Sequence, residues 1–193
     1  MTILILGLIG FISVHMIRVI GEDWRTAMLE RIGNKRFKML YSIISLVSFA
    51  LMVWGYAIAR QKSSILWQAP AIGFYLTAVL MLLSMVLLAG FHMQRSHLSV
   101  KLRHPMLWSV VLLCVAHLLV NGRAIDALLF GSLLVWSVLC LISCYRRDAR
   151  YQVEYPSPVL RTTFLNLALG VVFYAVFTFL LHAPLIGVSP IPQ

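Results

Sequence analysis

Six long apolar segments dominate the sequence and limit what this chain can fold into. A helix needs about 20 apolar residues to cross about 30 Å of hydrocarbon, and backbone inside a bilayer must bond within helices or closed barrels. No strand-like alternation of apolar and polar residues competes with helix in these segments. We therefore predict an all-α, polytopic integral membrane bundle of about six transmembrane helices, forming one membrane domain over residues 1–193. The segments are residues 3–20, 40–59, 69–91, 105–120, 125–145 and 163–181.

The composition supports a lipid bilayer as the main partner. Apolar residues make up 61% of the chain and charged residues 11%, whereas soluble domains are nearer half and a quarter. The net charge is +10, but the basic residues lie in short loops between apolar segments, where they orient a chain against a membrane. This distribution argues against nucleic-acid binding. Composition does not separate a receptor, a transporter and an enzyme.

Lysine and arginine are divided unequally between the two sets of loops. Of the sixteen, all but Arg60, Lys62 and Arg123 fall in the loops after the first, third and fifth segments. Loops rich in lysine and arginine stay on the cytoplasmic side. With an even number of crossings, both termini are predicted to face away from the cytoplasm.

The fourth and fifth segments are predicted to form a helical hairpin. Pro105 suits the first position of a helix, and the pair Asn121-Gly122 is typical of a helix end. The helix between them is short, about 24 Å long. Arg123 and Asp126 at the turn are interpreted as interfacial charges that form a surface pair.

Two histidines lie inside apolar segments, where polar groups are costly and tend to serve function. His15 is in the first segment, and His117 is in the fourth, on one helix face with Cys114 and Asn121. Neutral imidazole is a common metal ligand, and thiolate is an alternative ligand of haem iron. The Cys-x-x-His pair lacks the further ligands of a zinc site, whereas a six-coordinate haem needs only two. Hydrogen bonding between helices and simple packing remain open for these residues.

A third histidine stands at the predicted cytoplasmic start of the fourth segment, in Arg103-His104-Pro105. Proline disfavours helical geometry at His104, which leaves its side chain free to turn into an interfacial pocket. His104 and His117 are separated by about 19 Å along a helix, too far to bind one iron. The remaining histidines are interpreted as solvated residues at the ends of segments: His92, His97 and His182.

Several segments in order along residues 1–145 resemble the NnrU family. They include HMIR at 15–18, RIGNKRF at 31–37, Leu40-Tyr41-Ser42, GYAIAR at 55–60, KLRHPML at 101–107, AHLLVNG at 116–122 and LFGS at 129–132. The resemblance implies a bacterial inner-membrane protein associated with nitrite and nitric oxide reduction, in which the termini predicted from the charge distribution are periplasmic. The molecular activity of the family is not settled.

The NnrU family is itself similar to the plant 15-cis-zeta-carotene isomerase, a haem b enzyme with histidine ligands and, in one state, a cysteine ligand. The resemblance implies haem b between the first and fourth segments, with His15 and His117 on the iron and Cys114 as the alternative ligand. Electron transfer, nitric oxide sensing and redox-gated isomerisation of a lipid-soluble substrate are the implied roles. Respiratory or denitrification proteins are the implied partners. The secondary cofactor-binding residues are His104, Arg103 and Asn121.

Two other functions remain open at this point. The Arg103-His104-Pro105 run resembles the cofactor-binding segment of isoprenylcysteine-type membrane methyltransferases, which use adenosylmethionine. The following hairpin is present, but the acidic pair of those enzymes is not, since only Asp148 and Glu154 lie downstream. The third possibility is a non-enzymatic accessory or transport protein whose histidines only pack helices. Whether the chain is an enzyme is left open by its sequence.

Overall fold

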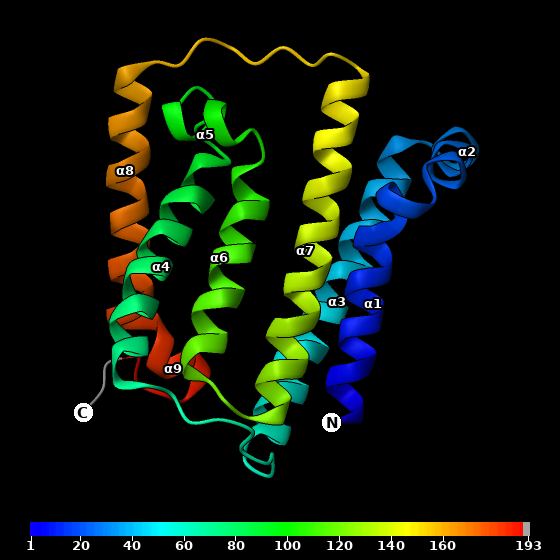
Figure 1. Ribbon diagram of the computed structural model, residues 1–193. Helices are drawn as coiled ribbons and strands as arrows, with labels where there is room; N and C mark the ends of the chain where they lie inside the picture. The colour runs from blue at the N-terminus through cyan, green and yellow to red at the C-terminus, as the bar shows by residue number, and fades with distance from the viewer. Residues whose placement is uncertain (191–193) are drawn as a thin grey trace.

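Long helices build most of the described chain, residues 1–190, in this computed structural model (Figure 1). Within these residues there is no strand, only an isolated antiparallel bridge between Ile65 and Arg123. The prediction of an all-α bundle is confirmed. The elements are α1 (Thr2–Ile20), α2 (Glu22–Ile32), α3 (Asn34–Arg60), α4 (Ala71–Gly90), α5 (His97–Leu102), α6 (Pro105–Val120), α7 (Ala124–Arg150), α8 (Leu160–Ala175), a π-helical turn (Val176–Leu181) and α9 (His182–Ile186).

Five helical stretches are long and apolar enough to cross a membrane. Four are α1, α3, α4 and α7, and the fifth runs through α8, the π-helical turn and α9 as Leu160–Ile186. The sixth apolar helix, α6, has 16 residues and is therefore about 24 Å long. It begins at Pro105 and ends at Val120, as the sequence predicts. The chain is a multi-pass membrane protein.

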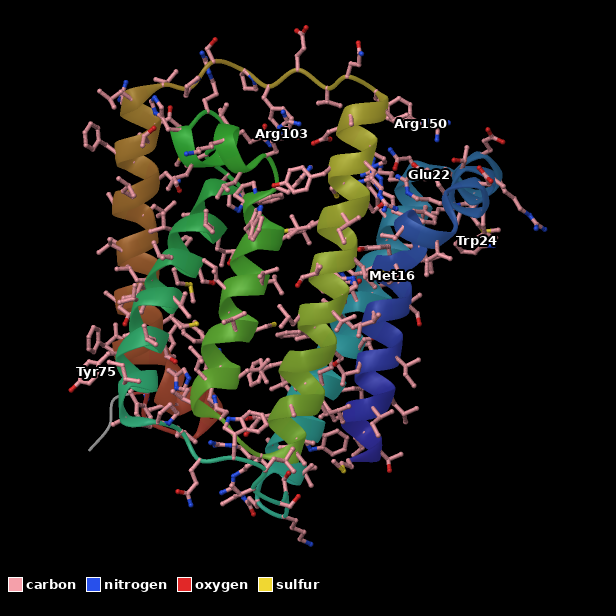
Figure 2. The ribbon with its side chains drawn as sticks, in the orientation of Figure 1. Met16, Glu22, Trp24, Tyr75, Arg103 and Arg150 are labelled. Carbon is pink, nitrogen blue, oxygen red and sulfur yellow. The ribbon has the colours of Figure 1, made fainter. Side chains whose placement is uncertain are left out.

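Two short helices lie in loops where the sequence predicts no element. The longer one, α2, places Arg25, Met28, Leu29 and Ile32 on one half-buried face, at helical spacing. Its Trp24 is 54% exposed and lies away from the bundle (Figure 2). This apolar stripe is short and lies in a charged segment, so a search for long apolar segments does not detect the helix.

Close backbone packing joins α1 to α3. A Cβ atom at Gly7 would lie 2.6 Å from the backbone nitrogen of Met52, and one at Gly10 or Gly55 would overlap Ser48 or Leu4. Small residues at these positions let the two helices approach closely, which is how apolar helices associate without a hydrophobic driving force in lipid. The α1–α3 pair is therefore a fixed wall of the bundle.

The remaining spans form a second group around α4, which packs against α6 and α8. Ser84 on α4 donates a hydrogen bond to the Ser109 carbonyl on α6, at 2.9 Å. Helix α7 packs against α6 on one side and against α1 and α3 on the other, and it lies between these groups in Figure 1. The predicted hairpin of α6 and α7 is present, and α7 is the member that joins it to α1.

At one end of the bundle, called here the Arg123 end, the chain is held by a buried polar network. The guanidinium of Arg123 donates to the carbonyls of Arg60 and Ser63, both at 3.2 Å. Asp126 accepts from the backbone N–H of Arg123 at 3.0 Å and from the Tyr56 hydroxyl at 2.6 Å. Asp126 is only 1% exposed, so the interpretation of Arg123 and Asp126 as a surface pair is wrong. Asp126 is buried because it caps the start of α7 and because Tyr56 of α3 packs against it and donates a hydrogen bond.

Candidate functional site

His15 is held on α1 with one ring nitrogen free. Its Nδ1 lies 2.7 Å from the carbonyl oxygen of Phe11, one turn earlier. Since a carbonyl only accepts, Nδ1 must donate, and the neutral ring then carries its lone pair on Nε2. The ring stacks on Phe11 and meets the rings of Tyr41 and Trp136 at centroid distances of 5.2 and 5.4 Å. Side chains from three helices therefore fix its orientation.

The His15 side chain lines a cavity of about 280 Å³ between α1, α2 and α3, called here the His15 cavity. Three cations, Arg18, Arg25 and Lys38, also line it, and no carboxylate does. None of the three has an ion pair within residues 1–190. The cavity therefore combines an imidazole with uncompensated positive charge. Its other lining residues are Val14, Ile17, Asn34, Phe37 and Tyr41.

His117 on α6 has the same local arrangement in different surroundings. Its Nδ1 lies 2.9 Å from the carbonyl oxygen of Leu113, which again leaves the lone pair of the neutral ring on Nε2. The ring stacks on Phe130 of α7 at a centroid distance of 4.5 Å. Asn121 donates to the His117 carbonyl at 3.1 Å and so closes the end of α6. Cys114, one turn before His117, is fully buried.

The structure does not bring His15 and His117 together. Their contacts on α7, Trp136 and Phe130, are six residues apart, or about 9 Å along the helix. Helix α7 also lies between α1 and α6 (Figure 1). The two imidazoles therefore contact α7 at different levels, and their sharing of one iron stays a prediction. Among the described residues no group of three or more His, Cys, Asp or Glu side chains is placed to hold a metal ion.

Within the described part of the chain, His104 makes the one contact between a basic side chain and a carboxylate that is close enough for an ion pair, and it is an ion pair when the imidazole is protonated. Its Nε2 lies 2.8 Å from Oδ2 of Asp148 on α7, and the two side chains are 19% and 10% exposed. Tyr155 donates its hydroxyl to the same oxygen at 2.8 Å. Burial, this hydrogen bond and the nearby charge raise the pKa of Tyr155 from 10.0 to about 12. The pair links the start of α6 to the end of α7.

The turn that presents His104 has unusual backbone geometry. Arg103 has a φ of 60°, a region that favours glycine. Arg103 lies at the turn after α5 (Figure 2). Its guanidinium stands over the Tyr155 ring, 5.3 Å from the ring centroid. Backbone strain of this kind tends to be kept at functional sites.

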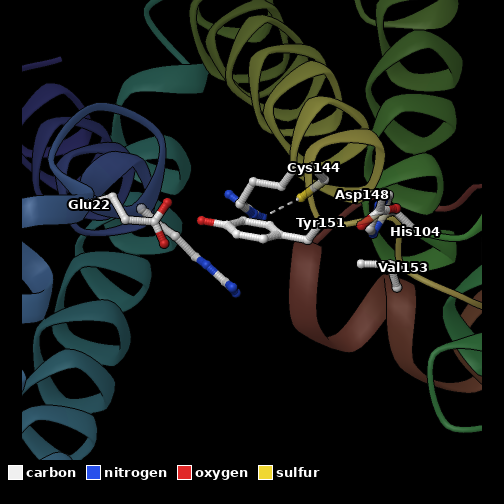
Figure 3. Close-up of a pocket in the computed structure, with 8 residues that line it drawn as sticks. Glu22, His104, Cys144, Asp148, Tyr151 and Val153 are labelled. Carbon is white, nitrogen blue, oxygen red and sulfur yellow. Dashed lines mark hydrogen bonds and ion pairs between the residues drawn. The ribbon is translucent and has the colours of Figure 1, made fainter.

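A second cavity, of about 390 Å³, lies beside this pair and is called here the His104 cavity. Figure 3 shows Glu22 of α2 on one side, His104 and Asp148 on the other, and the Tyr151 ring between them. Arg18 lines both cavities, so they adjoin at the end of α1, called here the Arg18 end. The full lining is Arg18, Glu22, His104, Cys144, Arg147, Asp148, Tyr151 and Val153.

Nothing in the sequence pairs Asp148 with His104, because the two are separated by 44 positions. One signal was available. Asp148 lies in the last turn of α7 among arginines, where the helix dipole disfavours a carboxylate. An acid kept there requires a cationic or hydrogen-bonding partner from elsewhere. Arg25 was missed for a different reason, since its place at the His15 cavity depends on α2.

The comparisons with known proteins agree with the resemblance in the sequence. The model of the NnrU protein family matches residues 3–190, nearly the whole chain. This chain belongs to the NnrU family. The match of this NnrU protein to its family extends past residue 145, although the sequence after that residue shows fewer of the segments typical of the family. No curated protein and no solved structure matches it significantly.

Proposed function

We propose that this NnrU protein binds one b-type haem at the His15 cavity, with Nε2 of His15 as the protein ligand to iron. One observation carries the proposal. His15 lines a cavity whose charged lining is entirely cationic, and its Nε2 has no hydrogen-bond partner among the described residues. In metal sites a ligating histidine usually donates its other ring N–H to a carbonyl or carboxylate, as His15 does to Phe11.

The cations of the cavity suit the acidic edge of the cofactor. Haem b carries two propionate groups, and guanidinium and ammonium groups bind carboxylates by charge-assisted hydrogen bonds. Arg25 and Lys38 line the cavity without a carboxylate partner in the described chain. They are the residues that would hold the propionates, while the rings of Phe11, Tyr41 and Trp136 keep water from the imidazole.

Bound haem would supply one-electron chemistry or a site for a diatomic gas. That chemistry suits electron transfer, nitric oxide sensing or redox-gated isomerisation of a lipid-soluble substrate, alongside proteins of denitrification. In this proposal His117 and Cys114 stabilise the contact of α6 with its neighbours and do not ligate the same iron. Their separation from His15 by α7 supports this assignment.

The test is a matched pair of variants, His15→Ala and His117→Ala, purified from cells supplied with a haem precursor. Both histidines make the same bond to their own helix, so each controls for the other. We expect His15→Ala to lose most of its haem, measured by pyridine haemochrome absorbance, and His117→Ala to keep it.

Loss of haem from both variants would show that two helices rearrange to share one iron, and would overturn the single-histidine site. Retention by both would place the haem elsewhere, with His104 next to be replaced. Wild-type protein without a Soret band would favour the accessory function. Adenosylmethionine binding that depends on His104 would instead favour the methyltransferase.

A further inference from the structure

We propose that the His104 cavity binds a small weak oxyacid of the carboxylic type, passing the acid's proton to Nδ1 of His104 and holding the anion with Arg18 and Arg147. The site is separate from the haem ligand His15 and needs no haem. Four structural features of the cavity support this proposal: the orientation of the imidazole, its carboxylate partner, the charge of the lining and the bonds that already join the helices.

The imidazole of His104 is oriented with one nitrogen free. Nε2 is engaged by Asp148, and Nδ1 has no hydrogen-bond partner within residues 1–190. The Tyr145 ring meets the imidazole edge-on at 5.2 Å, and the strained turn at Arg103 fixes the backbone before it. A carboxylate that orients an imidazole in this way leaves the other nitrogen as a proton acceptor.

Asp148 is held so that it stabilises a protonated His104. It accepts from both His104 and Tyr155 at 2.8 Å and is 9% exposed. Once Nδ1 takes a proton, the imidazolium and the carboxylate form a charge-assisted pair, which is stronger than a neutral hydrogen bond. The proton acceptor and its counter-ion are therefore assembled before any ligand arrives.

The charge of the lining links anion binding to proton uptake. With His104 neutral, Arg18 and Arg147 balance Glu22 and Asp148, and the cavity has no net charge. Protonation of His104 makes the cavity positive, which matches one anion. The titratable and charged groups around the imidazole are Asp148, Arg147, Cys144 and Tyr145 of α7, Arg18 of α1, Glu22 of α2, and Arg103, Tyr151 and Tyr155 of the loops.

The proton-transfer step is balanced. The acid HA gives its proton to the Nδ1 lone pair, so the O–H bond breaks and an N–H bond forms. The anion A⁻ remains between the two guanidinium groups. Arg147 is already positioned by its bonds to Cys144 Sγ at 3.1 Å and Ser143 Oγ at 3.4 Å on its own helix.

The competing explanation is that His104 and Asp148 only join α6 to α7. Other bonds already make that connection. Trp108 donates to the Tyr145 hydroxyl at 2.9 Å, and Tyr145 donates to the Leu102 carbonyl at 2.8 Å. The ion pair therefore adds an oriented imidazole at a cavity, beyond what the junction needs.

The experiment uses sodium formate as the probe and the purified full chain in detergent. Proton uptake is followed with a pH dye in weakly buffered solution, and affinity by calorimetry. At about pH 7 formate is ionised, so the proton comes from the solution, and we expect up to one proton taken up per formate bound. Formate affinity should fall as the pH rises, by up to about tenfold for each pH unit, which is the limit for one linked proton. Chloride at equal concentration should give neither signal.

Matched variants locate the site. His104→Gln keeps a hydrogen bond to Asp148 but takes no proton. The proton uptake that accompanies formate binding should therefore disappear, while the unfolding temperature stays close to that of the wild type. Arg147→Gln should weaken formate binding about tenfold or more. Arg150→Gln is the control, because Arg150 stands over the Tyr151 ring and does not line the cavity. His15→Ala should still bind formate, which excludes binding at haem iron.

Three results would overturn the proposal. These are formate binding without proton uptake, proton uptake that survives in a folded His104→Gln protein, and equal effects of the two arginine variants. If His104→Gln does not fold, Asp148→Asn takes its place, with a weaker formate affinity expected because the imidazolium loses its counter-ion. Failure of the haem proposal leaves these measurements unaffected.

Discussion

The arginines at the two ends of the bundle differ in their partners. At the Arg123 end, Arg123, Asp126 and Tyr56 bond to one another and to backbone carbonyls. At the Arg18 end, Arg18 and Arg25 line cavities and have no ion pair within the described chain. Buried polar groups that have partners within the chain stabilise the fold, whereas cations left without partners at a cavity remain available to a ligand. The Arg123 end is therefore structural, and the Arg18 end carries both proposed sites.

The largest effect on stability is expected from Gly122→Ala at the Arg123 end. A Cβ atom there would overlap the Trp67 carbonyl and lie 2.8 Å from its carbon, and both groups are backbone. We expect a loss of about 3 kcal/mol or more in the free energy of unfolding, measured by denaturant titration in detergent. Gly131→Ala is the control, since a Cβ there meets nothing within 4 Å and alanine favours helix. Equal effects of the two substitutions would contradict the close approach at Gly122.

A smaller loss is expected from Asp126→Ala, about 2–3 kcal/mol in the same measurement, because the Tyr56 hydroxyl and the Arg123 N–H would lose their acceptor. Tyr56→Phe removes one donor and leaves the cap of α7, so about 1 kcal/mol is expected. If the two variants proved as stable as wild type, the Arg123 end would owe its stability to packing alone.

Tyr155→Phe tests the hydrogen bond behind Asp148 through its dependence on pH. The pKa of Tyr155 is raised from 10.0 to about 12, so the folded protein holds the phenol proton more tightly than the unfolded chain. This stabilising contribution is complete below about pH 10 and is lost as the pH rises to about 12. The unfolding temperature of Tyr155→Phe should therefore lie below wild type at about pH 9, and the difference should shrink at higher pH. If the difference in unfolding temperature did not change with pH, the hydrogen bond from Tyr155 to Asp148 would not account for it.

The smallest effect on stability belongs to Arg25→Gln and Lys38→Gln at the Arg18 end. Neither cation has an ion pair in the described structure, so each change should fall within about 0.5 kcal/mol. The haem content of the double variant should nevertheless fall severalfold. Lys62→Gln, in the loop after α3, is the control and should change neither quantity. A large loss of stability with unchanged haem would show that these cations support the fold.

The sequence by itself determined the class of fold, because five of the six apolar segments are long enough to define their own spans. It also predicted where α6 begins and ends, because Pro105 favours a helix start and Asn121-Gly122 favours a helix end through local backbone conformation. Residues 15–18 and 116–122, among others, pointed to the NnrU family, which the match over residues 3–190 confirms. In each case the information lies within a few residues along the chain.

The tertiary structure decided which polar residues share a site. The sequence marked His15 and His117 as a pair, but it holds no information on which face of α7 each helix packs against. It marked His104 without its partner Asp148, because the contact depends on how α6 and α7 cross at the Arg18 end. Arg25 joined the His15 cavity only through the packing of α2. Helices form from local hydrogen bonds and apolar length, whereas sites between helices depend on contacts among residues far apart in the chain.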